Sequence, residues 1–278
     1  MAEENKENCS GSCSSCGEAG TCQSKKSPYE PMNAHSHIKN VIAVVSGKGG
    51  VGKSMATASI ARELVKKGFK VGILDADITG PSIPKMYGIH NHAKGSDTEL
   101  FPAEAEDGTK IMSINLLLPE EESPVIWRGP ILAGVVKQFW SDVCWGELDY
   151  LLIDLPPGTG DVPLTVFQSI PVTGCVIVTS PQDLVRMIVQ KAYNMADKMG
   201  IRVLGIVENF SYLICPDCGK RINIFGESDI DTIAAQLGLP VMAKIPIDPK
   251  ISGYVEAERF WQIDMDYMEG AVKYLPEI

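Results

Sequence analysis

The sequence contains no apolar run of about 20 residues, which is the length that a membrane-spanning helix requires. Its first residues, MAEENKENCS, also lack the basic-then-apolar order of a secretory signal. Basic residues are in deficit, with 25 Lys and Arg against 35 Asp and Glu, a net charge of −10. Because nucleic acid and anionic membranes are bound by clustered Lys and Arg, neither is expected as a partner. These absences predict a cytoplasmic protein whose eight cysteines are reduced thiols.

Aromatic residues are also scarce, at 7% of the chain, although hydrophobic residues reach 45%. Small and branched aliphatic residues must therefore fill the core, which suits an α/β fold with buried parallel strands. From Ile38 onward, apolar strand patterns alternate with helical spacing, which predicts a mainly parallel sheet with helices on both faces. The expected strands are 38–46, 70–77, 148–156, 174–180, 201–209 and 240–246, and the clearest helices are 52–67 and 182–199.

Residues 1–37 differ in composition from the rest of the chain. They are rich in Ser, Glu, Asn, Gly and Cys and contain almost no aliphatic residues. Such a segment cannot offset its ordering entropy by apolar burial. We therefore expect 1–37 to be a flexible, Cys-rich tail unless a metal organises it, and 38–278 to be one folded domain.

A glycine-rich stretch, SGKGGVGKS, joins the first expected strand to the first expected helix. The spacing Gly47-x-x-x-x-Gly52-Lys53-Ser54 is that of the phosphate-binding loop of P-loop NTPases, in which backbone amides and a helix N-terminus surround the phosphates. Lys53 is expected to reach the β and γ phosphates, and the Ser54 hydroxyl to bind Mg²⁺. A chance glycine-rich turn is the alternative, and the flanking strand and helix disfavour it. The expected nucleotide-contacting residues of this loop are Gly47, Lys48, Gly49, Gly50, Val51, Gly52, Lys53, Ser54 and Met55.

Acidic residues follow two of the expected strands. Asp75 and Asp77 end the second strand, and Asp154 ends the apolar run LLIDLP. We assign Asp77 to the orientation of the attacking water, and Asp75 and Asp154 to the surroundings of Mg²⁺. Gly158 and Gly160 can change conformation when a γ-phosphate is present. Each carboxylate alone could be a helix cap, but their shared position beside one phosphate loop favours the catalytic interpretation.

Lys48 gives the loop a second lysine, and KGGVGKS resembles the deviant phosphate loop of the MinD/ParA/nitrogenase-iron-protein superclass. The resemblance implies that Lys48 reaches the partner's phosphates across a nucleotide-sandwich homodimer, in the role of an arginine finger. A solvated loop lysine is the alternative. Met55 stands where the superclass usually has threonine, so a hydroxyl contact to the α-phosphate is expected to be lost. The superclass also implies that Asn209 hydrogen-bonds adenine, which favours ATP.

The stretch CPDCG places Cys215 and Cys218 at a metal-ligand spacing. Zinc or an iron–sulfur cluster requires about four ligands, and no second C-x-x-C follows. Two copies of the chain would supply four thiolates, so we infer a [4Fe–4S] cluster on the two-fold axis of a homodimer. Zinc, a dithiol redox pair and a plain structural turn remain as alternatives. Cys144 and Cys175 lie among apolar residues and are interpreted as packing residues.

The tail carries four more thiols within fourteen residues. Cys9, Cys13, Cys16 and Cys22 have the spacing C-x₃-C-x₂-C-x₅-C. Four thiolates can ligate one iron–sulfur cluster within a single chain. Incidental cysteines in a disordered tail are the alternative.

Five motifs in order resemble the Mrp/ApbC family of iron–sulfur cluster carrier ATPases, over residues 38–255. They are KGGVGKS (48–54), DADITGPS (75–82), WRGP (127–130), DLPPGTGD (154–161) and CPDCG (215–219). The resemblance implies ATP binding, slow hydrolysis, homodimerisation and a labile cluster at Cys215 and Cys218 that passes to apoproteins. The tail resembles that of the family's eukaryotic cytosolic scaffold branch, whose spacing Cys13, Cys16 and Cys22 match. Cys9 lies closer to Cys13 than that branch's first cysteine does.

Two other functions share the phosphate loop. A positioning ATPase of the MinD/ParA type binds membrane or DNA, but the end of this chain, DMDYMEGAVKYLPEI, is acidic and short. An ATP-driven reductase like the nitrogenase iron protein also bridges a dimer with four thiols, but its ligands are spread along the chain. The C-x-x-C pair therefore favours the carrier over both.

Overall fold

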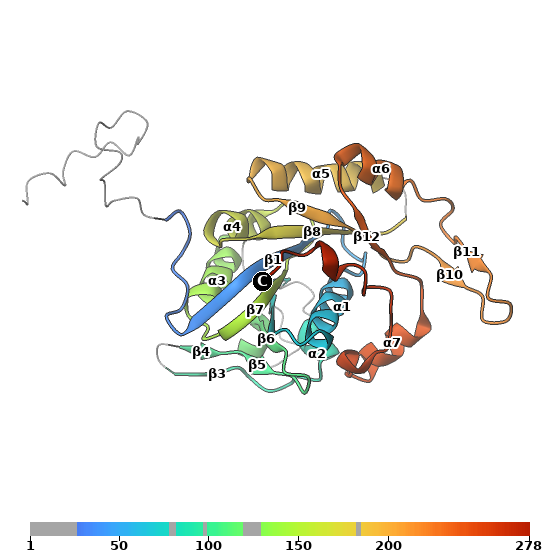
Figure 1. Cartoon of the computed structure of the whole chain (residues 1–278). Helices are drawn as coiled ribbons and strands as arrows, with labels where there is room; N and C mark the ends of the chain where they lie inside the picture. The colour runs from blue at the N-terminus through green and yellow to red at the C-terminus, as the bar shows by residue number, and fades with distance from the viewer. Residues whose placement is uncertain (1–26, 78–81, 97–98, 119–128, 182–184) are drawn as a thin grey trace, which may run out of the picture.

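The computed structural model describes residues 27–77, 82–96, 99–118, 129–181 and 185–278. Within these residues an eight-stranded sheet has the order β12-β9-β8-β1-β7-β2-β6-β5 (Figure 1). Every neighbouring pair is parallel except β5 and β6. The strands are β1 (Ser36–Val45), β2 (Val71–Asp75), β5 (Ala103–Glu104), β6 (Lys110–Ser113), β7 (Gly146–Asp154), β8 (Gly174–Thr179), β9 (Val203–Glu208) and β12 (Val241–Lys244).

Helices cover both faces of this sheet, as the alternating strand and helix patterns predict (Figure 1). Among the described residues, two short antiparallel pairs accompany the sheet, β3 (Lys94–Gly95) with β4 (Leu100–Phe101) and β10 (Leu213–Ile214) with β11 (Arg221–Ile222). The helices are α1 (Lys53–Lys66), α2 (Ile83–Met86), α3 (Gly129–Ser141), α4 (Asp161–Ser169), α5 (Val185–Lys198), α6 (Ile230–Leu237) and α7 (Pro249–Glu256), with 3-10 turns η2 (Ile114–Leu117), η3 (Phe260–Gln262) and η4 (Val272–Tyr274).

Two apolar cores lie on opposite faces of the sheet because successive side chains of a strand point to opposite faces. Along β1, Val41 and Ala43 belong to the core under α3 to α6, whereas Ile42 and Val44 belong to the core under α1 and the C-terminal segment. Each β1 residue from Val41 to Val45 is at most 3% exposed. The predicted α/β fold, with a mainly parallel sheet and helices on both faces, is therefore confirmed.

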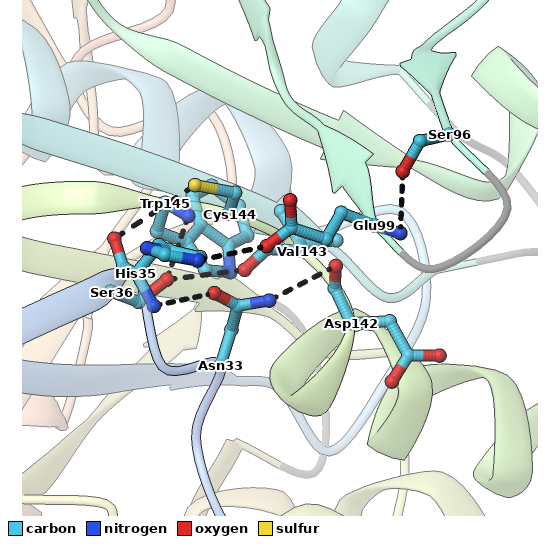
Figure 2. Close-up of polar contacts among 9 residues, drawn as sticks. All are labelled: Asn33, His35, Ser36, Ser96, Glu99, Asp142, Val143, Cys144 and Trp145. Carbon is cyan, nitrogen blue, oxygen red and sulfur yellow. Dashed lines mark hydrogen bonds and ion pairs between the residues drawn. The ribbon is translucent and has the colours of Figure 1, made fainter.

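The chain joins the domain before β1, and the predicted tail boundary at residue 37 falls inside that strand. Asn33 accepts a hydrogen bond from the His35 amide at 2.8 Å and donates one to the Asp142 carbonyl at 3.4 Å. The Ser36 hydroxyl donates to the Val143 carbonyl, as Figure 2 shows. Residues 33–36 are thereby fixed at the amino end of β7. The four tail cysteines lie outside the described residues.

None of the helices in the described part of the chain combines the length and the apolar character needed to cross a lipid bilayer.

Candidate functional site

The predicted polar residues gather at the carboxyl edge of the sheet. The phosphate loop follows β1, Asp75 ends β2, Asp154 ends β7, and Asn209 follows β9. Backbone hydrogen bonds hold these ends in register, including Ala76 N to Asp154 O at 2.9 Å and Gly158 N to Ser46 O at 2.7 Å. Ligands of open parallel sheets bind at this edge, so the placement agrees with a nucleotide site.

The phosphate loop requires glycine at position 52 for two independent reasons. Gly52 has a φ of 77°, a left-handed conformation that other residues adopt at a cost. A β-carbon there would also lie 2.1 Å from Nδ2 of Asn209, a severe collision. Gly47 is similarly constrained, because its β-carbon would lie 2.9 Å from the carbonyl oxygen of Ile188 on α5.

A cavity of about 380 Å³ opens in front of this loop and the N-terminus of α1. Lys48 is exposed at its rim, while Lys53 is buried within it. A helix N-terminus with inward-facing amides is a favourable environment for phosphate groups. The residues that line the cavity are Ser46, Lys48, Gly49, Gly50, Gly52, Lys53, Ser54, Met55, Asp77, Ser82, Met86 and Pro157.

Asp154 organises the charges behind the cavity. Its carboxylate is fully buried and lies 2.8 Å from Lys53 Nζ, which is also 3.5 Å from Asp77 Oδ2. The Ser54 hydroxyl donates to Asp154 at 2.5 Å, and the Thr57 hydroxyl lies 2.8 Å from it. Carboxylate and hydroxyl oxygens are the ligands that Mg²⁺ prefers, so this donor set fits that ion. Thr57, which lies about one helical turn after Ser54, was not among the predicted site residues.

Asp75 is buried at the end of β2 and is held by backbone hydrogen bonds. Its two oxygens accept hydrogen bonds from the backbone amides of Asp77 (3.2 Å) and Ile83 (3.4 Å). Burial, and then the nearby charge of Asp154, raise the pKa of Asp75 well above its ordinary value. Asp75 therefore holds the backbone at Asp77 and at Ile83 through its two carboxyl oxygens.

A second cavity, of about 600 Å³, adjoins the first through Gly52 and Met55, which line both. Asn209 closes it on one side and donates from Nδ2 to the Val51 carbonyl at 3.0 Å. Its Oδ1 is buried and has no hydrogen-bond partner among the described residues, so it can accept one from a bound molecule.

The opposite wall of this second cavity comes from residues that the sequence analysis did not single out. Phe210 and the segment 246–256, from the end of β12 into α7, form most of it. The stretch IPIDPK could have indicated this wall. It places Asp-Pro, a typical helix start, directly after an expected strand and therefore at the carboxyl edge of the sheet.

Cys215 and Cys218 lie in the turn between β10 and β11, a hairpin that projects from the β12 side of the sheet (Figure 1). The turn is closed by Cys215 N to Lys220 O and Gly219 N to Cys215 O, both at 2.9 Å. Cys218 is exposed and Cys215 is partly buried. Hydrogen bonds from the backbone amides of Cys218 and then Asp217 lower the pKa of the Cys215 thiol, which favours the thiolate that metals bind.

The two other described thiols have different surroundings. Cys175 is buried in β8, and burial raises its pKa to about 12, which confirms its interpretation as a packing residue. Cys144 is only partly buried and lies at the amino edge of the sheet, where its sulfur donates to the His35 carbonyl at 3.8 Å (Figure 2). Cys144 is therefore not a core residue and lies at the edge of the core, just before β7 begins.

Three comparisons show which known proteins this chain resembles. Residues 37–274 match the ParA-type family described as NUBPL iron-transfer P-loop NTPase. A protein of Clostridium perfringens named iron-sulfur cluster carrier protein is 45% identical over 262 residues, which cover 88% of this chain and 92% of that protein. A protein of the same name from Methanocaldococcus jannaschii is 47% identical over 249 residues, covering 87% and 86%. The solved nucleotide-binding protein of Archaeoglobus fulgidus in complex with ADP has a TM-score of 0.76 and 44% identity, covering 87% and 93%.

Proposed function

This chain belongs to the ParA-type iron-transfer P-loop NTPases, and from that premise we propose that it is an ATP-dependent iron–sulfur cluster carrier that delivers its cluster to apoproteins. The observation that carries the proposal is the thiol pair of the β10–β11 hairpin, with Cys218 exposed and Cys215 partly buried, on the same domain as a phosphate cavity. A positioning ATPase needs the cavity but has no use for the thiols. Reduced thiols also require a reducing compartment, consistent with the cytoplasm.

The two adjoining cavities fit the two ends of ATP. The phosphates occupy the smaller cavity, against the loop amides and Lys53, and adenine occupies the larger one, where Asn209 Oδ1 accepts from its amino group. Ser54 and Asp154 hold Mg²⁺, which supplies charge neutralisation at the phosphates. Asp77, 3.5 Å from Lys53, orients the attacking water.

Lys48 completes the site in trans. It is exposed at the rim of its own cavity, so a second copy facing this edge can receive its ammonium group. A cation delivered across a dimer stabilises the charge of the transferring phosphoryl group, as arginine fingers do. The homodimer is thus part of the proposal, and slow hydrolysis follows from a site that is incomplete in the monomer.

The cluster is cargo held between two hairpins. Cys215 and Cys218 of one chain supply two thiolates, and the same residues of a second chain complete the four ligands of a [4Fe–4S] cluster. Within the described residues no group of three His, Cys, Asp or Glu side chains gathers as a metal site. Zinc at the same four thiolates is the competing occupant.

Nucleotide state and cluster release are linked through the dimer. Gly158 has a φ of 90° and hydrogen-bonds Ser46 at the loop, so the stretch 158–160 can respond to the γ-phosphate. Closure through Lys48 changes the separation of the two hairpins and hence the hold on the cluster. By linkage, if nucleotide changes the affinity for the cluster by some factor, the cluster must change the affinity for nucleotide by that same factor. Cys9, Cys13, Cys16 and Cys22 hold a second cluster in this proposal.

The test uses full-length protein in which the four tail cysteines are replaced by serine, reconstituted anaerobically with iron and sulfide. We expect about four iron and four sulfide per two chains, a dimer in sedimentation, and transfer to an apoprotein that requires a [4Fe–4S] cluster. The matched variant Cys218→Ala should lose this iron and keep ATP binding. An iron-loaded protein that sediments as a monomer contradicts the proposal, as does a Cys218→Ala variant with full iron. Zinc bound at the four thiolates in place of iron contradicts the iron–sulfur assignment.

A further inference from the structure

The thiol-bearing segment leaves and re-enters the domain beside one buried carboxylate. We define the thiol excursion as residues 211–228, which contain β10, the two cysteines and β11. Glu208 ends β9 and is fully buried. Its carboxylate accepts one hydrogen bond from the hydroxyl of Ser211, at the start of the excursion, and another from that of Ser228, at its end. A single side chain therefore fixes both ends of the segment.

The residues next to Glu208 form a wall of the larger cavity. Asn209 and Phe210 both line it. Phe210 has a φ of 58°, an unfavourable conformation for a bulky residue that persists only where its surroundings impose it. The chain thus runs from the buried Glu208 through Asn209 and the strained Phe210, which line the cavity, directly into the thiol excursion. Any molecule that fills the cavity contacts this strained point.

The excursion is tied to the opposite cavity wall as well. Ser211 N donates to Ile245 O at 2.9 Å, and Ile247 N donates to Tyr212 O at 2.7 Å, while Ile247 itself lines the cavity. The guanidinium of Arg221, a residue of β11, lies over the Tyr212 ring, 3.9 Å from its centroid. These contacts connect the cavity to both strands that flank the thiols.

We propose that Glu208 is a positioning residue that makes the thiol excursion follow the occupancy of the larger cavity, so that a bound nucleotide changes the accessibility of Cys215 and Cys218 within one chain. This coupling acts in cis and is separate from dimer closure. It rests on the proposed function only in naming the occupant as an adenine nucleotide.

The test measures thiol alkylation in metal-free, full-length protein with and without Mg-ADP. Iodoacetamide labelling followed by peptide mass spectrometry resolves the Cys215–Cys218 peptide from the other thiols, and Cys144 at the opposite edge serves as the internal reference. In the wild type we expect ADP to change the labelling rate of the thiol pair by about five-fold and that of Cys144 hardly at all.

Glu208→Ala removes both anchors and should reduce this response to less than about two-fold, with ADP affinity retained in calorimetry. Glu208→Gln should restore much of the response, because its amide oxygen accepts from one serine and its amide nitrogen donates to the other. The double variant Ser211→Ala/Ser228→Ala removes the same hydrogen bonds without touching β9. It replaces Glu208→Ala if that protein does not fold.

The outcomes separate this inference from the proposed function. A wild-type response that persists in Glu208→Ala or in the double serine variant overturns the inference alone. Equal acceleration of Cys144 and of the thiol pair, with or without ADP, identifies general loosening and also overturns it. A wild type that binds ADP without any change in labelling overturns it too. A protein that shows the Glu208-dependent response but binds no iron supports the inference and refutes the carrier function.

Discussion

The phosphate site buries its charges, whereas the thiol hairpin has one exposed and one partly buried cysteine. Lys53 is 6% exposed and Asp154 is fully buried, and together they are surrounded by hydroxyl groups of α1. Cys218 lies on a turn between two-residue strands at the surface. The first region is enclosed by its own chain, while in the proposed function the second supplies only two of four thiolates. The contrast indicates that the phosphate site requires rigidity, whereas the thiol hairpin requires access to other molecules.

This difference predicts opposite responses to substitution. A buried ion pair is costly to break, because the remaining charge stays buried without its partner. An exposed turn tolerates substitution with little change in stability. Variants in the two regions should therefore separate effects on folding from effects on metal binding.

The largest effect is expected for Lys53→Ala. The variant removes the ammonium group next to Asp154 and Asp77, so ATP hydrolysis should fall about a thousand-fold or more. The free energy of unfolding should fall by about 3 kcal/mol, because a buried carboxylate loses its partner. Steady-state hydrolysis and urea unfolding measure the two. Unchanged stability would show that the site is less closed than its geometry indicates.

The next prediction compares the thiol of Cys215, in the surface turn, with that of Cys175, buried in β8. The pKa of Cys215 lies below the ordinary 9.0, so its reactive thiolate forms at lower pH than in an exposed peptide. The pKa of Cys175 is raised to about 12, so little thiolate forms there at pH 7. We expect Cys175 to be alkylated more than about a hundred-fold more slowly than Cys215 at pH 7 in metal-free protein. Labelling between pH 6 and pH 10 followed by peptide mass spectrometry gives both profiles, and a Cys215 midpoint above 9.0 would contradict the hydrogen-bond argument.

Lys48→Ala is the matched partner of Lys53→Ala on the same loop. Lys48 is exposed, so unfolding should change by no more than about 0.5 kcal/mol. Hydrolysis should fall about a hundred-fold if the ammonium group acts across the dimer. Mixing this variant with a Lys53→Ala chain tests the trans role, because a mixed dimer retains one site with both lysines. Absence of any regained activity in the mixture would argue for a role in cis.

The smallest effect is expected for Thr57→Val. The hydroxyl lies 2.8 Å from Asp154, and its removal from a buried site should cost about 1–2 kcal/mol of unfolding free energy. Ser59→Ala is the control, since its buried hydroxyl donates to the Met55 carbonyl of the same helix. Urea unfolding should show a clearly smaller cost for the control. Thr57→Ser should behave like the wild type.

Local sequence patterns predicted the fold class and the contents of the carboxyl edge. The six expected strands correspond to β1, β2, β7, β8, β9 and β12, because apolar runs between turn residues are short-range signals. The phosphate-loop spacing likewise fixes where Lys53 and Ser54 lie, since a strand and a helix flank it.

Contacts between distant segments could not be predicted in this way. Phe210 meets the segment 246–256 only because β12 pairs with β9, and the sequence does not state that pairing. In the sequence Glu208 is only an acidic residue at a strand end, and its contact with Ser228, twenty residues later, exists only in the folded chain. The position of Cys144 depends on where β7 begins relative to residues 33–36. Each of these features depends on tertiary packing.

In the proposed ATP site, the close approach of Gly52 to Asn209 has a consequence for redesign of base preference. Because a single added carbon at position 52 would overlap the Asn209 amide, no spare volume separates the two. Engineers who seek a guanine-accepting variant therefore cannot enlarge residue 209 without pushing the glycine backbone out of place. Mutational libraries should instead diversify the facing wall, at Ile247 and Ile251, where changes in shape leave the glycine backbone intact.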